Sequence, residues 1–296
     1  EPRADTPTLG YAPAATKVYR AQPNKVSIGG YGEMVYKNVS TRRQDGASAG
    51  VRDAADFLRN IVYVGYKFND WILFNSEIEF EHGTTGNTRG EVSVEAAYID
   101  FRFSQPFGIR AGTLLVPMGI TNETHEPTTF HGVLRPSVEQ NIIPSTWREN
   151  GVGVFGEAGI VSYRSYVMTG LQAIKDTGVD GFKSSDGLRK GRSSAAKSFA
   201  EDLAWVGRVD IALGQGVKAG TSLYVGEADQ STRTLRSVSV TLREVHLQAE
   251  YGGAELKVLY ALGTIGSAGA LNSAQGFTNA KKNSVGSRFF GGYVEG

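Results

Sequence analysis

Three glutamates at alternate positions, Glu77, Glu79 and Glu81, followed by His82, are the residues of this chain best placed to do chemistry. In a β-strand, alternate side chains share one face, so these carboxylates would form a row with a spacing of about 7 Å. Hard cations such as Ca²⁺ prefer carboxylate oxygens, but one ion would not easily bridge all three. We expect the row to line the wall of a polar interior space and to pair with arginines of neighbouring strands. A metal site and a rim site for lipopolysaccharide-bound cations are the less favoured interpretations.

The histidines, at positions 82, 125, 131 and 246, offer a second candidate chemistry. His125, Glu126 and His131 carry groups that ligate zinc, but no strand or helix is expected to fix their geometry, and the chain has no cysteine to assist. None of the histidines sits in a nucleophile motif that we recognise. We expect no catalytic residue, no metal and no cofactor, and therefore no enzyme. A membrane-embedded hydrolase is kept as an alternative.

A basic, glycine-rich stretch at 181–192 offers a third candidate, a cradle for phosphate. Such loops work between a strand and a helix, and that setting is missing here, so we expect a mobile outer loop. The formal net charge of the chain is only +1, which gives no reason to expect a nucleic-acid partner.

The elements that must position these residues are strands, because polar and apolar side chains alternate along most of the chain. Between Ile72 and Glu81, isoleucine and phenylalanine face one side and glutamate the other. The segments are about 9–12 residues long, the length that crosses a bilayer when a strand is tilted. The predicted strands are 25–37, 53–68, 71–82, 91–103, 107–115, 149–156, 160–171, 201–213, 217–227, 239–251, 254–264 and 285–295.

Short and long connections alternate along this series of strands. Tight turns such as Asn69-Asp70 and Gly252-Gly253 are followed by long loops, which places all turns at one end of an up-and-down barrel. Aromatic residues gather beside the short turns, as in the aromatic girdle of an outer-membrane barrel; they are Tyr66, Phe68, Trp71, Phe103, Phe107 and Tyr251. The fold class predicted is all-β, an antiparallel up-and-down transmembrane β-barrel with at least 12 strands in this chain. A soluble β-sandwich is the alternative fold.

The polar face carries too many charges for a dry core, since an unpaired buried ion costs several kcal/mol. We therefore expect the apolar face to contact lipid and the polar face to line water. The candidate pore-lining residues are Arg59, Glu77, Glu79, Glu81, Arg110, Arg164, Arg208 and Lys218. Residues 1–24, which hold four prolines and show no period, are expected to form an extended periplasmic lead-in to a barrel that spans 25–296.

The connection at 116–148 is longer than most loops, and loops of this length usually have a function or are disordered. Together with Glu77–His82, the stretches Val116–Asn122 and Ile143–Glu149 resemble the phosphate-selective porin O and P family of outer-membrane proteins. The resemblance spans roughly residues 26–296. It implies a 16-stranded barrel, a homotrimer, an anion-preferring channel and a loop at 116–148 that folds inward and narrows it.

This chain departs from the family in two respects. It shows about twelve strands and lacks a terminal aromatic residue, so we expect that its C-terminal strands are missing. Its constriction is also less basic than phosphate selectivity requires; the candidate constriction residues are Asn122, Glu123, His125, Glu126, His131, Arg135 and Arg148.

The function predicted is that of a porin in the outer membrane of a Gram-negative cell. Small hydrophilic solutes or ions would diffuse through a water-filled lumen, with anion preference set by the arginines. The expected partners are outer-membrane lipid, lipopolysaccharide and the solutes themselves. The alternative is a closed or narrow outer-membrane barrel with a structural or partner-binding role.

Overall fold

The computed structural model describes residues 11–296 except 87–88, 175–180, 215, 231–236 and 278–282. Twelve strands form one antiparallel sheet in which each strand pairs with the next in the chain. They are β1 (Lys25–Lys37), β2 (Ala54–Lys67), β3 (Ile72–Glu81), β4 (Val92–Arg102), β5 (Gly108–Leu115), β6 (Arg148–Ala158), β7 (Val161–Thr169), β8 (Leu203–Gly214), β9 (Val217–Glu227), β10 (Ser239–Tyr251), β11 (Ala254–Ile265) and β12 (Arg288–Glu295). The predicted all-β, up-and-down architecture of at least twelve strands is confirmed.

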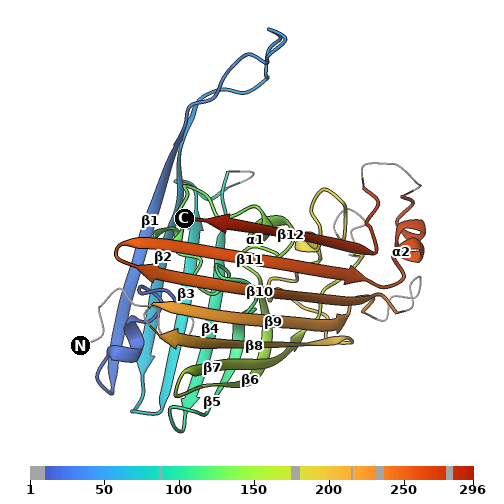
Figure 1. Ribbon diagram of the computed structural model, residues 1–296. Coiled ribbons are helices and arrows are strands. Elements are labelled where there is room, and N and C mark those ends of the chain that lie inside the picture. Colours follow the sequence, from blue (N-terminus) through green and yellow to red (C-terminus); the bar gives the residue numbers. More distant parts are fainter. Residues whose placement is uncertain (1–10, 87–88, 175–180, 215, 231–236, 278–282) are drawn as a thin grey trace.

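The sheet is strongly curved, and its strands turn from upright at β1 to almost level at β12 (Figure 1). This turning is the right-handed twist expected of strands, accumulated over the sheet. Strands β1 and β12 are the two edges in the described pairing order. The long connection between β5 and β6 lies on the concave side, where its helix α1 (Val138–Asn141) contacts β12.

The burial of the two sheet faces is the reverse of that in a soluble sandwich. On β8, the apolar residues Leu203, Val209 and Leu213 are 54%, 40% and 61% exposed on the convex face. The concave face of the same strand carries Arg208 and Asp210, which are 5% and 1% exposed. This arrangement excludes the soluble sandwich, because a sandwich would bury its apolar face. A sheet whose outer surface contacts lipid needs this arrangement.

Aromatic side chains cluster on the outer surface beside the short turns. Trp71, Phe103 and Phe107 are each more than two fifths exposed. The ring centroids of Trp71 and Phe103 lie 5.8 Å apart and those of Phe103 and Phe107 lie 5.9 Å apart, in stacked pairs. These contacts join the β2–β3 turn to the β4–β5 turn, which is the arrangement expected of a girdle at a membrane interface.

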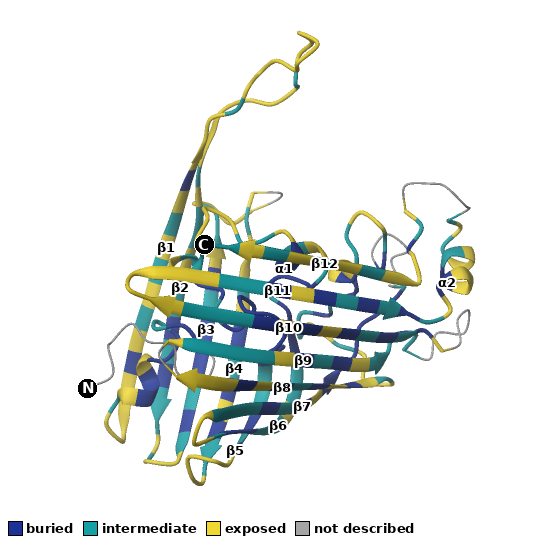
Figure 2. Cartoon of the chain, viewed as in Figure 1, coloured by how far each residue is buried: buried dark blue, intermediate teal, exposed yellow. Residues whose placement is uncertain are grey.

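Strands β1 and β2 continue beyond the rest of the sheet as a two-stranded ribbon (Figure 1). Their register shifts between Glu33 and Met34, where a bulge separates the sheet from the ribbon. We call residues 34–57, the parts of both strands beyond this bulge with their connecting loop, the β1–β2 arm. Most residues of the arm are exposed to solvent (Figure 2).

The described part of the N-terminal segment differs from the expected extended lead-in. Lys17–Arg20 form a 3₁₀ helix, η1, and Tyr11, Val18 and Tyr19 are buried. The Val18 side chain packs against Gly65 of β2 and occupies the space that a larger side chain at position 65 would need. The segment therefore packs on the inner face of the sheet. The prolines predicted an irregular backbone, but they gave no sign of the apolar and aromatic side chains that anchor this segment. Strand β1 begins at Lys25, as predicted.

The interior is filled at the end where the long loops lie. Inward-facing positions there are apolar, including Val206, Val240 and Leu259, and they join Trp147 and Phe182 of the loops in one core. The prediction of a water-filled lumen is therefore wrong for this part of the interior, because the loops supply enough apolar surface to exclude water there. No helix among the described residues is long and apolar enough to cross a membrane.

Candidate functional site

The connection between β5 and β6, residues 116–147, enters the interior with its first part and its end. All residues from 116 to 126 except Thr124 are buried. The Asn122 side chain donates to the carbonyl oxygens of Val116 and Trp147, and its Oδ1 accepts from the Trp147 amide. Asn122 therefore holds the two ends of the loop together, because it satisfies backbone groups that would otherwise be buried without partners. We call residues 116–147 the inner loop.

A cavity of about 280 Å³ lies between the inner loop and strands β1–β4. Its charged lining combines five glutamates with five arginines; these are Glu33, Glu79, Glu81, Glu91, Glu95, Arg59, Arg135, Arg148, Arg189 and Arg192. The glutamates come from β1, β3, β4 and the residue just before β4. The arginines come from β2, the inner loop, β6 and the connection between β7 and β8. A space with this lining is suited to a hydrated, charged or polar solute.

Some of the charged side chains that line the cavity form ion pairs with one another, and Arg135 does not. Arg59 lies 2.9 Å from Glu33 and 3.5 Å from Glu79, and Arg148 lies 3.2 Å from Glu95. Arg135 stacks over Phe130 at 5.5 Å, and among the described residues no carboxylate lies within ion-pair distance of it. Burial, together with the neighbouring Arg59 guanidinium, lowers the pKa of Arg135. Arg135 therefore brings to the cavity a guanidinium that forms no ion pair with the described residues.

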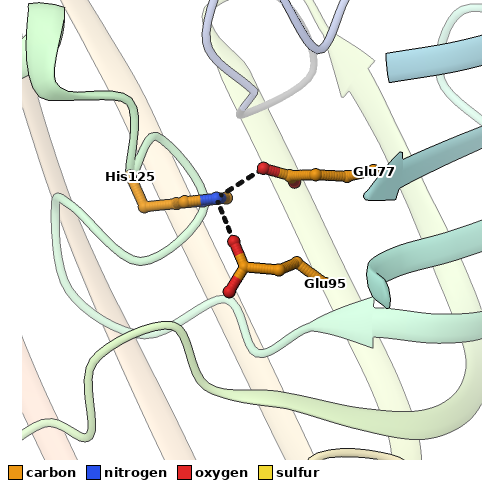
Figure 3. Close-up of side chains that lie close together, drawn as sticks. All are labelled: Glu77, Glu95 and His125. Atoms are coloured by element: carbon orange, nitrogen blue, oxygen red, sulfur yellow. Dashed lines mark hydrogen bonds and ion pairs between the residues drawn. The ribbon is translucent and has the colours of Figure 1, made fainter. Parts of the chain in front are cut away.

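Beside the cavity, His125 of the inner loop contacts Glu77 of β3 and Glu95 of β4 (Figure 3). Its Nε2 lies 2.9 Å from Glu77 Oε1 and 3.2 Å from Glu95 Oε2. The three residues are at most 2% exposed. The Tyr63 hydroxyl also donates to Glu77 Oε1, at 2.8 Å. These contacts join the inner loop to two strands of the wall.

Arg110, predicted to line the pore, is fully buried. Its guanidinium donates to both carboxylate oxygens of Asp100, at 2.6 and 2.8 Å. It also donates to the hydroxyls of Tyr11 and Tyr19, both at 2.9 Å. Because Tyr11 and Tyr19 belong to the N-terminal segment, Arg110 anchors that segment to β5. A guanidinium held in this way is not available to a solute.

Arg164 and Arg208, also predicted to line the pore, form a second buried network. Arg164 and Arg208 both contact Asp210, at 3.1 and 2.8 Å, and both contact Glu123 of the inner loop, at 3.2 and 3.8 Å. Lys218, which is 39% exposed, lies 3.6 Å from Asp210. Arg110, Arg164 and Arg208 thus do not line the described cavity. Of the predicted pore-lining set, Arg59, Glu79 and Glu81 do so.

The candidate constriction residues are also dispersed. Arg135 and Arg148 reach the cavity. Glu126 accepts a hydrogen bond from the Ala15 amide at 3.1 Å, and His131 lies 2.6 Å from Glu255 of β11. The structure therefore does not bring His125, Glu126 and His131 together as a zinc-binding set.

Sequence reasoning missed the contribution of the connection between β7 and β8 to the cavity. Within the predicted mobile outer loop at 181–192, Phe182 and Leu188 are fully buried and Arg192 donates to the Ser145 carbonyl. The expectation of a mobile outer loop is wrong for these residues, because their apolar side chains pack into the interior. The apolar pair within a basic stretch was the signal that could have indicated this.

One stretch matches the Gly-x-Ser-x-Gly pattern of hydrolases, Gly46 to Gly50. It lies at the tip of the β1–β2 arm, where Ser48 forms a bridge with Arg42 and accepts from the Gly50 amide. A nucleophile elbow requires a turn between a strand and a helix, with a histidine nearby. No described histidine hydrogen-bonds to Ser48, so this match carries no hydrolase site.

No family model matches the sequence. A relative described as an uncharacterized protein, from Aquifex aeolicus (strain VF5), is 40% identical over 270 residues, which cover 90% of this chain and 59% of the relative. The chain therefore spans less than two thirds of the length of this relative.

Similar solved structures include three proteins of low sequence identity. A loop-deletion mutant of OmpT, an outer membrane protein of Vibrio cholerae, is 10% identical with a TM-score of 0.39, over 82% of this chain and 83% of that chain. An anion-selective porin from Comamonas acidovorans is 15% identical with a TM-score of 0.38, over 82% and 80%. OccAB1 of Acinetobacter baumannii is 13% identical with a TM-score of 0.35, over 85% and 65%. These identities and scores are too low to transfer a function to this chain.

Proposed function

We propose that this chain forms the wall of an outer-membrane channel that admits small hydrophilic solutes or ions. The observation that carries the proposal is the reversed burial of the sheet. Apolar side chains cover the convex face, and a cavity of about 280 Å³ with a charged lining lies on the concave side. A charged interior behind a lipid-facing wall is what passive transfer of polar solutes requires.

The passage follows the cavity beside β1–β4, since the inner loop, the β7–β8 connection and the N-terminal segment fill other parts of the interior. It is therefore narrower than the open lumen predicted from strand alternation alone. Arg135 gives the passage its preference for anions, because its positive charge has no carboxylate partner among the described residues. Transport of this kind needs no catalytic group and no cofactor.

Single-channel conductance in a planar bilayer, with a salt gradient across it, tests this proposal. We expect stepwise conductance and a reversal potential that favours anions. Arg135→Glu should shift the reversal potential towards cations. The matched control is Arg43→Glu, at the exposed tip of the β1–β2 arm, which should leave the reversal potential unchanged. Verified insertion without conductance would support the alternative, a closed barrel with a structural or partner-binding role.

The same proposal includes the homotrimer that the family resemblance implies. It also includes contacts of the apolar convex face with lipid and lipopolysaccharide. Cross-linking of the detergent-solubilised protein checks the assembly, and a monomer under all conditions would contradict it.

A further inference from the structure

The environments of the two most buried histidines differ in a way that points to a ligand. His246 has one carboxylate at each ring nitrogen, with Asp210 at 2.9 Å from Nε2 and Glu244 at 2.9 Å from Nδ1. Both N–H groups of a protonated imidazole would therefore find an acceptor. His246 is satisfied as an ordinary ion-paired histidine.

His125 has both carboxylates at the same nitrogen. Glu77 Oε1 and Glu95 Oε2 lie 2.9 and 3.2 Å from Nε2, whereas Nδ1 is buried and has no hydrogen-bond partner among the described residues. One proton on Nε2 must then serve two carboxylates, and Glu95 Oε2 accepts no well-aligned hydrogen bond. The negative charges of both carboxylates must therefore be met at Nε2 alone.

We propose that Glu77, Glu95 and His125 form a binding site for a first-row divalent cation such as Zn²⁺. The three ligand atoms lie within 4.8 Å of one another. Tetrahedral zinc with bonds of about 2.0–2.1 Å holds its ligand atoms about 3.4 Å apart, so small shifts of these side chains would admit the ion. One imidazole with two carboxylates suits zinc, and the fourth position would take water.

The surroundings of the three ligands resemble the outer shell of a metal site. The Tyr63 hydroxyl donates to Glu77, and Arg148 Nη1 donates to the second oxygen of Glu95 at 3.2 Å. Such hydrogen bonds fix the orientation of ligating carboxylates. Glu95 and Arg148 also line the cavity, so one of the three ligands borders the space from which an ion would enter.

A bound ion would fasten the inner loop to the wall. His125 comes from the loop, whereas Glu77 and Glu95 come from β3 and β4. The cation would replace the shared proton with a separate bond to each side chain. The inference concerns binding and does not rest on conduction, so it can fail or succeed independently of the proposed channel function.

The rival is a protonated His125 held between the two carboxylates without a metal. Burial disfavours the charged imidazole, but Glu77 and Glu95 raise the pKa of His125 to about 10. This rival predicts that the folded protein does not bind Zn²⁺ at this position. It can therefore be separated from the proposal by a direct titration.

Zn²⁺ binding to the folded protein, measured by competition with a chromophoric chelator in detergent, tests the site. We expect one tight Zn²⁺ per chain and a loss of affinity of at least about 100-fold in His125→Gln and in Glu95→Gln. Tyr63→Phe keeps every ligand and should weaken binding by about 10–100-fold. The matched control is His246→Gln, which should leave Zn²⁺ affinity unchanged.

Absence of tight binding by the folded wild type would overturn the proposal, and so would equal binding by wild type and His125→Gln. X-ray absorption of the Zn²⁺-loaded wild type tests the site directly. It uses no variant, so a folding defect cannot affect its result. A first shell of one imidazole nitrogen and carboxylate oxygens supports the site, whereas a shell of several imidazoles or of water alone contradicts it.

Discussion

At the level of single residues, Arg110 holds the N-terminal segment through a charge that is fully removed from water. Removing one partner of such a pair leaves the other charge buried and uncompensated, which costs about 3–5 kcal/mol. We expect Arg110→Met to lower the free energy of unfolding by this amount, measured by urea titration of the folded protein in detergent. Arg43→Met, at the exposed tip of the arm, is the control and should change little.

A double variant separates the ion pair from the rest of the Arg110 environment. If the loss comes from an unpaired Asp100, Arg110→Met combined with Asp100→Asn should cost clearly less than the sum of the two single changes. Strict additivity would mean that the tyrosine contacts, and not the ion pair, hold the segment.

The sequence predicted the direction in which these charges point but not their partners. Alternation along a strand fixes which face Arg110, Arg164 and Arg208 occupy, because it depends only on neighbouring positions. Their partners lie far away in the chain: Tyr11 is 99 positions from Arg110, and His125 is 48 positions from Glu77. Whether an inward charge meets water or a counter-charge depends on the packing of non-repeating loops, which has no periodic signal.

At the level of elements, the N-terminal segment narrows the interior and should limit conductance. A Cβ on Gly65 of β2 would lie 2.6 Å from the Val18 side chain, too close for both to stay in place. We expect Gly65→Leu to displace the segment and to raise the single-channel conductance. Gly83→Leu is the control, since nothing lies within 4 Å of a Cβ there. Unchanged conductance in a folded Gly65→Leu protein would show that the segment does not border the passage.

The strands themselves were predictable to within a few residues. The largest discrepancy is at the start of β12, expected at residue 285 and found at Arg288. Period-two alternation and glycine-rich turns define strands without tertiary information. By contrast, η1 and the buried residues of the β7–β8 connection follow no period, and their positions depend on the interior that the strands enclose.

At the level of the whole molecule, the exposed apolar residues of the convex face predict that lipid surrounds this face. Val209 lies on the outer face of β8 and is 40% exposed. In lipid, Val209→Arg should cost about 2–4 kcal/mol, whereas Tyr251→Arg, beside a short turn, should cost about 0–1 kcal/mol because it lies near the interface. Denaturant unfolding in lipid vesicles measures both values. Equal costs at the two positions would contradict the proposed membrane position.

The β1–β2 arm has a consequence for how the protein can change over generations. Its side chains at Met34, Tyr36 and Val51 are 74%, 65% and 48% exposed, so few neighbours constrain their identity. Substitutions and small insertions at its tip should therefore be nearly neutral for folding. Sequence changes should therefore accumulate in the arm faster than in the wall, whose buried charges each have specific partners.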